Sequence, residues 1–129
     1  MSAFDTAHWP KEIRLLTAEK VLEVEFDDRT FRFPAEFLRV ESPSAEVQGH
    51  GPGQKQIVSG RSQVGILRVE PVGHYAIRIV FDDLHDTGIF SWTYLHQLGR
   101  EQGKRWQDYL AALAERGLAR DPPGRSKAV

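Results

Sequence analysis

Apolar and polar residues alternate in two runs within residues 20–33, and this pattern restricts the fold more than any other feature of the sequence. A period of two buries one face of a β-strand and leaves the other face in water. The charged segment 27–29 interrupts the alternation near its centre, which predicts an antiparallel hairpin, with residues 13–17 as a third strand. The apolar positions of this hairpin are Leu22, Val24, Phe26, Phe31 and Phe33.

The second half of the chain changes from the periodicity of strands to that of helices. Residues 64–69 and 75–81 are typical of two further strands, and an amphipathic helix is predicted after Ser91, a candidate N-cap. A second amphipathic helix is predicted over residues 106–113, with Gly117 as its stop. Strands first and helices last favour an α+β fold, in which a small antiparallel sheet packs against C-terminal helices.

Glycine and proline mark the expected breaks between these elements. Pro34 should end the hairpin and begin a short helical turn that reaches Val40. Gly99 and Gly103 are expected to separate the two C-terminal helices. Residues 42–61 are rich in Ser, Gly and Pro and predict a long loop, and loops of that length in a small domain are usually functional or mobile.

Length and composition favour a single domain over residues 12–117. The chain has 129 residues, of which 40% are hydrophobic and 27% charged, and one core commonly organises about 100–200 residues. Residues 1–11 and 118–129 are expected to be flexible termini, because the last segment in particular has too little apolar content to pack.

The absence of cysteine excludes several kinds of site. Without thiolates the chain forms no disulfide framework, no iron–sulfur cluster on its own ligands, no cysteine nucleophile and no thiolate zinc site. The net charge of −1 supplies no field that would attract nucleic acid or an anionic membrane, and no apolar run is long enough for a membrane span. We therefore expect a cytoplasmic protein that binds neither nucleic acid nor membrane.

Two segments hold candidate ligand residues. In residues 49–54, Gly-His-Gly-Pro-Gly-Gln, glycine amides could converge on an anion and His50 could act as a ligand or proton carrier. Because glycine and proline are also the ordinary residues of loops, a flexible loop without chemistry is the favoured interpretation. In residues 82–88, three aspartates and His85 could hold a divalent cation, although aspartate and glycine also form ordinary turns.

Aromatic and basic residues offer two further candidates. Trp92, Tyr94 and Trp106 could form a platform for a base or a quaternary ammonium group, but their helical spacing favours core packing for the two tryptophans. Arginines in and before the later strands could meet a phosphate or an acidic partner, while strand alternation equally produces a solvated face, which we favour. These arginines are Arg61, Arg68 and Arg78. No serine lies in a nucleophile elbow, so a hydrolase is poorly supported.

Several segments taken together resemble one known family. They are residues 12–40, the sequence Ser-Pro-Ser-Ala-Glu-Val at 42–47, Gly-His-Gly at 49–51, and His-Asp-Thr-Gly-Ile-Phe-Ser-Trp at 85–92. The resemblance is to the DUF971 family, also called the gamma-butyrobetaine hydroxylase-like N-terminal domain, and it covers about residues 12–101. It implies a small α+β domain.

The resemblance also implies a role beside other domains. Members occur alone, ahead of the iron and 2-oxoglutarate domain of gamma-butyrobetaine and trimethyllysine hydroxylases, and fused to P-loop ATPases of iron–sulfur cluster assembly. In the hydroxylases the domain holds zinc through three cysteines after the first hairpin and one histidine near the last strand. Only His85 matches those ligands here, because Ser42-Pro43-Ser44 stands in the region of the cysteines and a hydroxyl is a poor substitute for thiolate. The zinc site is therefore expected to be lost.

Three hypotheses for function follow. The first is a non-enzymatic accessory domain in iron or iron–sulfur metabolism that binds a metal ion or a protein partner, such as an iron–sulfur assembly factor or an oxygenase. The second is a divalent metal site, for iron or zinc, on nitrogen and oxygen ligands. The third is a quaternary ammonium site on the 49–54 loop. The metal ligands would be His85, Asp86, His50 and Glu46, and the interaction loop would comprise Gly49, His50, Gly51, Gly53 and Gln54 with Trp92.

Overall fold

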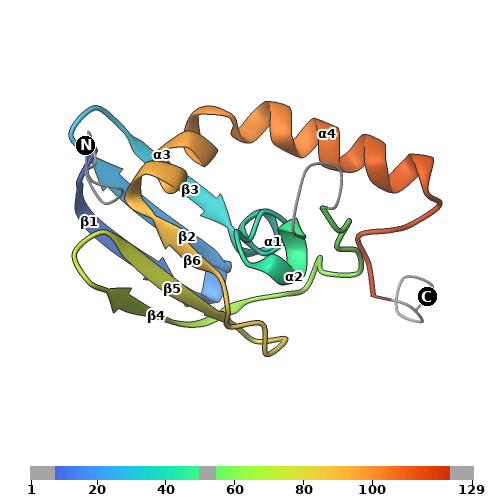
Figure 1. The fold of residues 1–129 in the computed structure, drawn as a ribbon, viewed down its shortest axis with the longest axis horizontal. Coiled ribbons are helices and arrows are strands. Elements are labelled where there is room, and N and C mark those ends of the chain that lie inside the picture. The colour runs from blue at the N-terminus through green and yellow to red at the C-terminus, as the bar shows by residue number, and fades with distance from the viewer. Residues whose placement is uncertain (1–7, 50–54, 123–129) are drawn as a thin grey trace.

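Two three-stranded antiparallel sheets and their covering helices form the protein (Figure 1). The structure, a computed structural model, describes residues 8–49 and 55–122, apart from the side chains of Ala45 and Glu46. The elements in chain order are β1 (Pro10–Leu16), a 3-10 helix (Thr17–Glu19), β2 (Val21–Phe26), β3 (Thr30–Pro34), α1 (Ala35–Val40), α2 (Ala45–Gln48), β4 (Ile66–Val72), β5 (Ala76–Phe81), β6 (Ile89–Ser91), α3 (Trp92–Arg100) and α4 (Gln102–Glu115).

The first sheet has the order β1-β2-β3 and confirms the predicted hairpin and third strand. Val24 of the central strand pairs with Ile13 of β1 and Phe31 of β3, and it is completely buried. On the opposite face, Arg14 of β1 lies 3.2 Å from Glu23 of β2. The alternation in the sequence therefore places apolar side chains in the core and charged pairs on the outer face.

The second sheet has the order β4-β5-β6 and contains one strand that the sequence did not predict. β6 spans only three residues, too few to show alternation, and it pairs with β5 through Ile89 opposite Arg78. Arg78 and Arg68 both donate hydrogen bonds to Glu70 on the exposed face of this sheet. The solvated-face interpretation of these two arginines is therefore confirmed.

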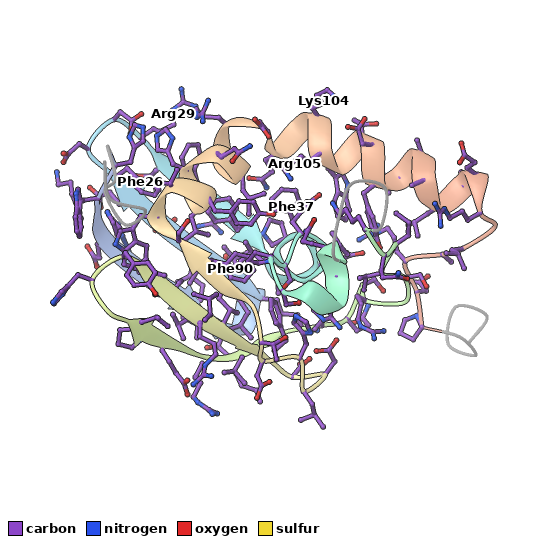
Figure 2. The ribbon with its side chains drawn as sticks, in the orientation of Figure 1. Phe26, Arg29, Phe37, Phe90, Lys104 and Arg105 are labelled. Carbon is purple, nitrogen blue, oxygen red and sulfur yellow. The ribbon has the colours of Figure 1, made fainter. Side chains whose placement is uncertain are left out.

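Both sheets bury one face in a shared core. Its largest fully buried side chains are Phe33, Phe37, Phe81, Phe90, Leu22, Leu38, Ile79, Leu95, Leu98 and Val24. Figure 2 shows Phe37 and Phe90 in the interior, whereas Arg29 and Lys104 point outward. The predicted N-cap is confirmed, because Ser91 Oγ accepts a hydrogen bond from the Tyr94 N–H at the start of α3. The fold is α+β, as the order of elements predicts.

The two C-terminal helices separate at Glu101, and both glycines that were expected to form the break lie inside helices. Gly99 faces Phe31, and a Cβ on this glycine would lie 2.4 Å from the ring. The glycine therefore serves close packing of α3 on β3, not helix termination. A Cβ on Gly103 would have no neighbour within 4 Å, so this second glycine faces open space. No helix in the described ranges is long and apolar enough to cross a membrane.

The long loop and the start of the C-terminal tail lie against each other. Residues 42–61 hold the short helix α2, and Val58 accepts a hydrogen bond from the Tyr109 hydroxyl of α4. Residues 119 and 120 accept backbone hydrogen bonds from Gly60 and Ser62. The tail is thus held at its beginning, while residues 1–7 and 123–129 of the predicted flexible termini lie outside the described residues.

Two glycine substitutions should change stability in opposite directions. Gly99→Ala is expected to lower the free energy of unfolding by about 1–3 kcal/mol, because the new methyl group must displace the Phe31 ring. Gly103→Ala is expected to raise it by about 0.5–1 kcal/mol, because alanine loses less backbone entropy in an open helical position. Urea denaturation of both variants measures the difference, and equal effects would contradict the assigned packing role of Gly99.

Candidate functional site

His85 lies in the segment between β5 and β6 and directs its ring toward the beginning of the long loop. Its Nε2 atom lies 2.9 Å from Ser42 Oγ and 3.4 Å from Ser44 Oγ, and the two hydroxyl oxygens are 3.4 Å apart. All three side chains are buried. The structure therefore joins the two motif segments of the sequence through one hydrogen-bonded cluster.

Gly88 allows this close approach. A Cβ at position 88 would lie 2.4 Å from Ser42 Oγ and 3.1 Å from the Phe90 ring. Only a residue without a side chain leaves space for the serine hydroxyl at this point. The glycine of the His-Asp-Thr-Gly segment is thus explained by packing against Ser42.

Asp83 fixes the turn that carries His85. One carboxylate oxygen accepts the backbone N–H of His85 at 3.1 Å, and the other accepts the Nε–H of Arg39 at 2.8 Å. The same oxygen lies 2.7 Å from Nε of Arg61. Burial raises the pKa of Asp83, but the hydrogen bonds from Arg39 and His85 and the charges of both arginines outweigh burial, so the pKa lies below its ordinary value.

Of the four predicted metal ligands, the side chains of two are described. His85 is buried with Nε2 against the two serine hydroxyls, whereas Asp86 is exposed. The side chain of Glu46 and the whole of His50 lie outside the described part of the chain. The four-ligand site therefore stays a prediction.

Of the residues in the predicted interaction loop, the structure describes only Gly49 and Trp92, and His50 lies among the residues outside it. Gly49 has a φ of 75°, and Gly51, Gly53 and Gln54 lie outside the described residues. Trp92 is only 8% exposed, and its indole N–H donates a hydrogen bond to the backbone oxygen of His74. An aromatic cage for a quaternary ammonium group needs exposed ring faces, and Trp92 packs in the core instead.

Tyr94, another aromatic residue of the candidate platform, also has a hydrogen-bond partner within the protein. Its hydroxyl donates a hydrogen bond of 2.6 Å to the backbone oxygen of Glu41. Burial, together with the charge of Glu41, raises the pKa of Tyr94 to about 12. The tyrosine therefore links α3 to the end of α1 as a neutral hydrogen-bond donor.

Ser42 and His85 are residue types that form catalytic pairs, but here the serine hydroxyl is not accessible to a substrate. Ser42 is completely buried, so its hydroxyl is out of reach of a substrate. The cluster therefore acts as a structural link between the loop and the turn. Sequence patterns did not reveal it, because the partners lie far apart in the chain, and only the resemblance of both segments to one family could have suggested their proximity.

A second histidine cluster, also unforeseen, lies near the N-terminal end. Possible ligand atoms of His8, Asp28 and His96 lie within 4.8 Å of one another. However, the rings of His8 and His96 stack at 3.5 Å with 7° between their planes. Nitrogen lone pairs lie in the ring plane, so two stacked rings in this arrangement do not point at a common ion.

The hydrogen bonds of the two ring nitrogens of His96 explain the role of this cluster. Arg100 Nε lies 3.2 Å from His96 Nδ1, which must accept its hydrogen, so Nε2 carries the proton and donates to Asp28 at 3.0 Å. The hydrogen bond from His96 in turn lowers the pKa of Asp28. The arrangement joins α3 to the hairpin turn of the first sheet.

Replacing His85 should destabilise the domain even when no metal is present. His85→Ala leaves two buried hydroxyls without their ring partner and is expected to lower the free energy of unfolding by about 2–4 kcal/mol. His74→Ala, at an exposed position, should change it by less than about 0.5 kcal/mol. Thermal unfolding with and without EDTA provides the measurement. A loss of wild-type stability in EDTA would contradict the structural role.

Solved structures similar to this chain support its placement in a family. One NMR solution structure has 44% sequence identity and a TM-score of 0.80, over 95% of this chain and 97% of that chain. A second NMR solution structure has 39% identity and a TM-score of 0.78, over 95% and 92%. A crystal structure of a DUF971 family protein of unknown function from Acidithiobacillus ferrooxidans has 45% identity and a TM-score of 0.59, over 70% and 91%.

No curated protein matches the chain. The family model described as "Gamma-butyrobetaine hydroxylase-like, N-terminal" matches residues 13–96, which include the second sheet, the first sheet except the start of β1, the Ser42–Ser44 segment and the turn with His85. Together with the DUF971 structure at 45% identity, this match confirms the resemblance found in the sequence. The chain belongs to the gamma-butyrobetaine hydroxylase-like N-terminal domain family.

Proposed function

We propose that this chain is a non-enzymatic accessory domain that binds a protein partner through the tip of the turn between β5 and β6. The observation that carries the proposal is Leu84, which is 82% exposed and has a φ of 73°. It is the most exposed of the large apolar side chains in the part of the chain that the structure describes. Figure 1 shows this turn projecting from the lower edge of the molecule.

The hydrogen bonds of the turn show why a leucine is unusual at this position. Leu84 N–H donates to Phe81 O at 3.1 Å, and Phe81 N–H donates to His85 O at 3.0 Å. This is a three-residue hairpin loop, whose last residue takes the left-handed conformation normally given to glycine or asparagine. Holding another residue there costs about 1–2 kcal/mol, and such strain concentrates at functional sites.

The base of the turn is rigid, which favours binding. Asp83 is held by Arg39, Arg61 and the backbone of His85, and His85 is in turn held by Ser42. A preorganised loop loses little conformational entropy when a partner covers it. The apolar tip is thus presented in one conformation.

The charges next to Leu84 indicate the chemistry of the partner. Asp82 and Asp86 are exposed on either side of the tip, whereas Asp83 is neutralised by its two arginines. The complementary surface is an apolar pocket with a basic rim. Because the chain is a member of this family, an iron–sulfur assembly factor or an oxygenase is the first class of partner to test.

Replacing Leu84 separates binding from stability. Leu84→Gly removes the apolar tip and relieves the backbone strain, so the free energy of unfolding should stay unchanged or rise by up to about 1 kcal/mol. Loss of one leucine from an apolar pocket, about 1.5–3 kcal/mol, should weaken partner binding by about 10- to 100-fold. Thermal unfolding measures stability, and binding of the partner to immobilised protein measures affinity.

The partner itself can be identified with a photo-reactive residue at position 84. Discrete covalent adducts should form from this position in a cell extract and not from position 9, where Trp9 is also exposed. Trp9→Ser is the matched control, since it removes another exposed apolar side chain and should leave partner affinity unchanged. Equal affinity of wild type and Leu84→Gly for the cross-linked protein would refute the proposal.

A further inference from the structure

We propose that a pocket beside the turn, separate from the partner surface at Leu84, binds the phosphate group of a small phosphate monoester. The pocket has a volume of about 430 Å³ and lies between residues 57–61 and the 82–88 turn. Arg39, Arg61 and Ser59 provide its hydrogen-bond donors. Its wall is completed by Val47, Ile57, Val58, Gly60 and His85.

The pocket carries an excess of positive charge. The guanidinium groups of Arg39 and Arg61 share a single carboxylate, because Nε of each lies within 2.8 Å of the same Asp83 oxygen. No acidic residue is among the described residues that line the pocket. Two cations and one anion leave a net charge of about +1, which an anion can compensate.

Both arginines also have unused hydrogen-bonding capacity. The Arg39 side chain is nine-tenths buried, and its Nη1 has no hydrogen-bond partner among the described residues. Nε of Arg61 is likewise unsatisfied, since its close contact with Asp83 is not aligned as a hydrogen bond. Buried guanidinium donors without acceptors are unfavourable, and a phosphate oxygen is the acceptor that fits the fork of an arginine.

Ligand entry requires a change in one side chain. Nη1 of Arg39 is closed off from solvent, whereas the Arg61 side chain is 36% exposed and lies at the pocket. We expect the Arg61 side chain to rotate and expose Nη1 of Arg39 to the anion. Arg61 would then donate its own hydrogen bonds to the phosphate oxygens that Arg39 binds. Its movement resembles the closing of an arginine clamp on a phosphate.

The remaining wall suits a phosphate monoester better than a free ion. The Ser59 hydroxyl has no hydrogen-bond partner among the described residues and offers a third donor. Val47, Ile57 and Val58 form an apolar side, where charged hydrogen bonds strengthen because water is excluded. The volume falls within the range of about 300–1,000 Å³ that small-molecule sites occupy, so it leaves space for an organic group.

A titration of the full, isotope-labelled chain with inorganic phosphate tests this site. At constant ionic strength, we expect saturable changes in the amide signals of Ser59, Gly60, Arg61 and His85, and in the Nε–H signals of the two arginines. Glycerol 3-phosphate should bind more tightly than inorganic phosphate, and acetate should cause no saturable change. Shifts that grow linearly with phosphate, or that spread over the whole surface, would overturn the proposal.

Matched variants separate the pocket from general charge effects. Arg61→Gln should weaken phosphate binding at least tenfold, whereas Arg78→Gln, with the same change of charge on the exposed face of β5, should stay within twofold of wild type. Ser59→Ala provides a second test that leaves every ion pair in place, and it should weaken binding about threefold or more. Wild-type affinity in both Arg61→Gln and Ser59→Ala would overturn the site.

Discussion

The carboxylate of Asp83 connects three parts of the chain that are distant in the sequence. It binds Arg39 of α1, Arg61 of the long loop and the backbone of the turn after β5. Because both arginines meet one oxygen, the turn can take only a narrow range of positions relative to α1. The orientation of the His85 ring toward Ser42 and the left-handed conformation of Leu84 both depend on these contacts of Asp83.

Hydrophobic burial and polar contacts contribute differently to the structure of this domain. The shared core, with Phe33, Phe81 and Phe90, determines how the two sheets pack, and this packing provides most of the stability. The polar contacts around Asp83 and His85 instead determine the shape of one surface region. That region contains both features for which we propose a function, the apolar tip and the arginine-lined pocket.

Local patterns predicted the elements that depend on local physics. The hairpin of β2 and β3 and the N-cap at Ser91 followed from alternation and capping, which involve neighbouring residues. The packing role of Gly99 could not be predicted from local patterns, because its close contact is with Phe31, which is far away in the chain. The Ser42–His85 contact and the Arg39–Arg61 pocket likewise arise only when the long loop folds against the turn. The periodicity of the sequence does not predict such contacts between distant segments.

The connectivity of the two sheets has a consequence for the order of folding. Each sheet is built from strands that follow one another in the chain, and the two sheets share no strand. Such pairings have short sequence separation, which favours rapid folding. Each sheet can therefore begin to form by itself, and the slower event is their docking, because the shared core is complete only when both sheets are in place. A chain stalled before docking would expose two apolar faces at once, which makes this step the point at which self-association competes with folding.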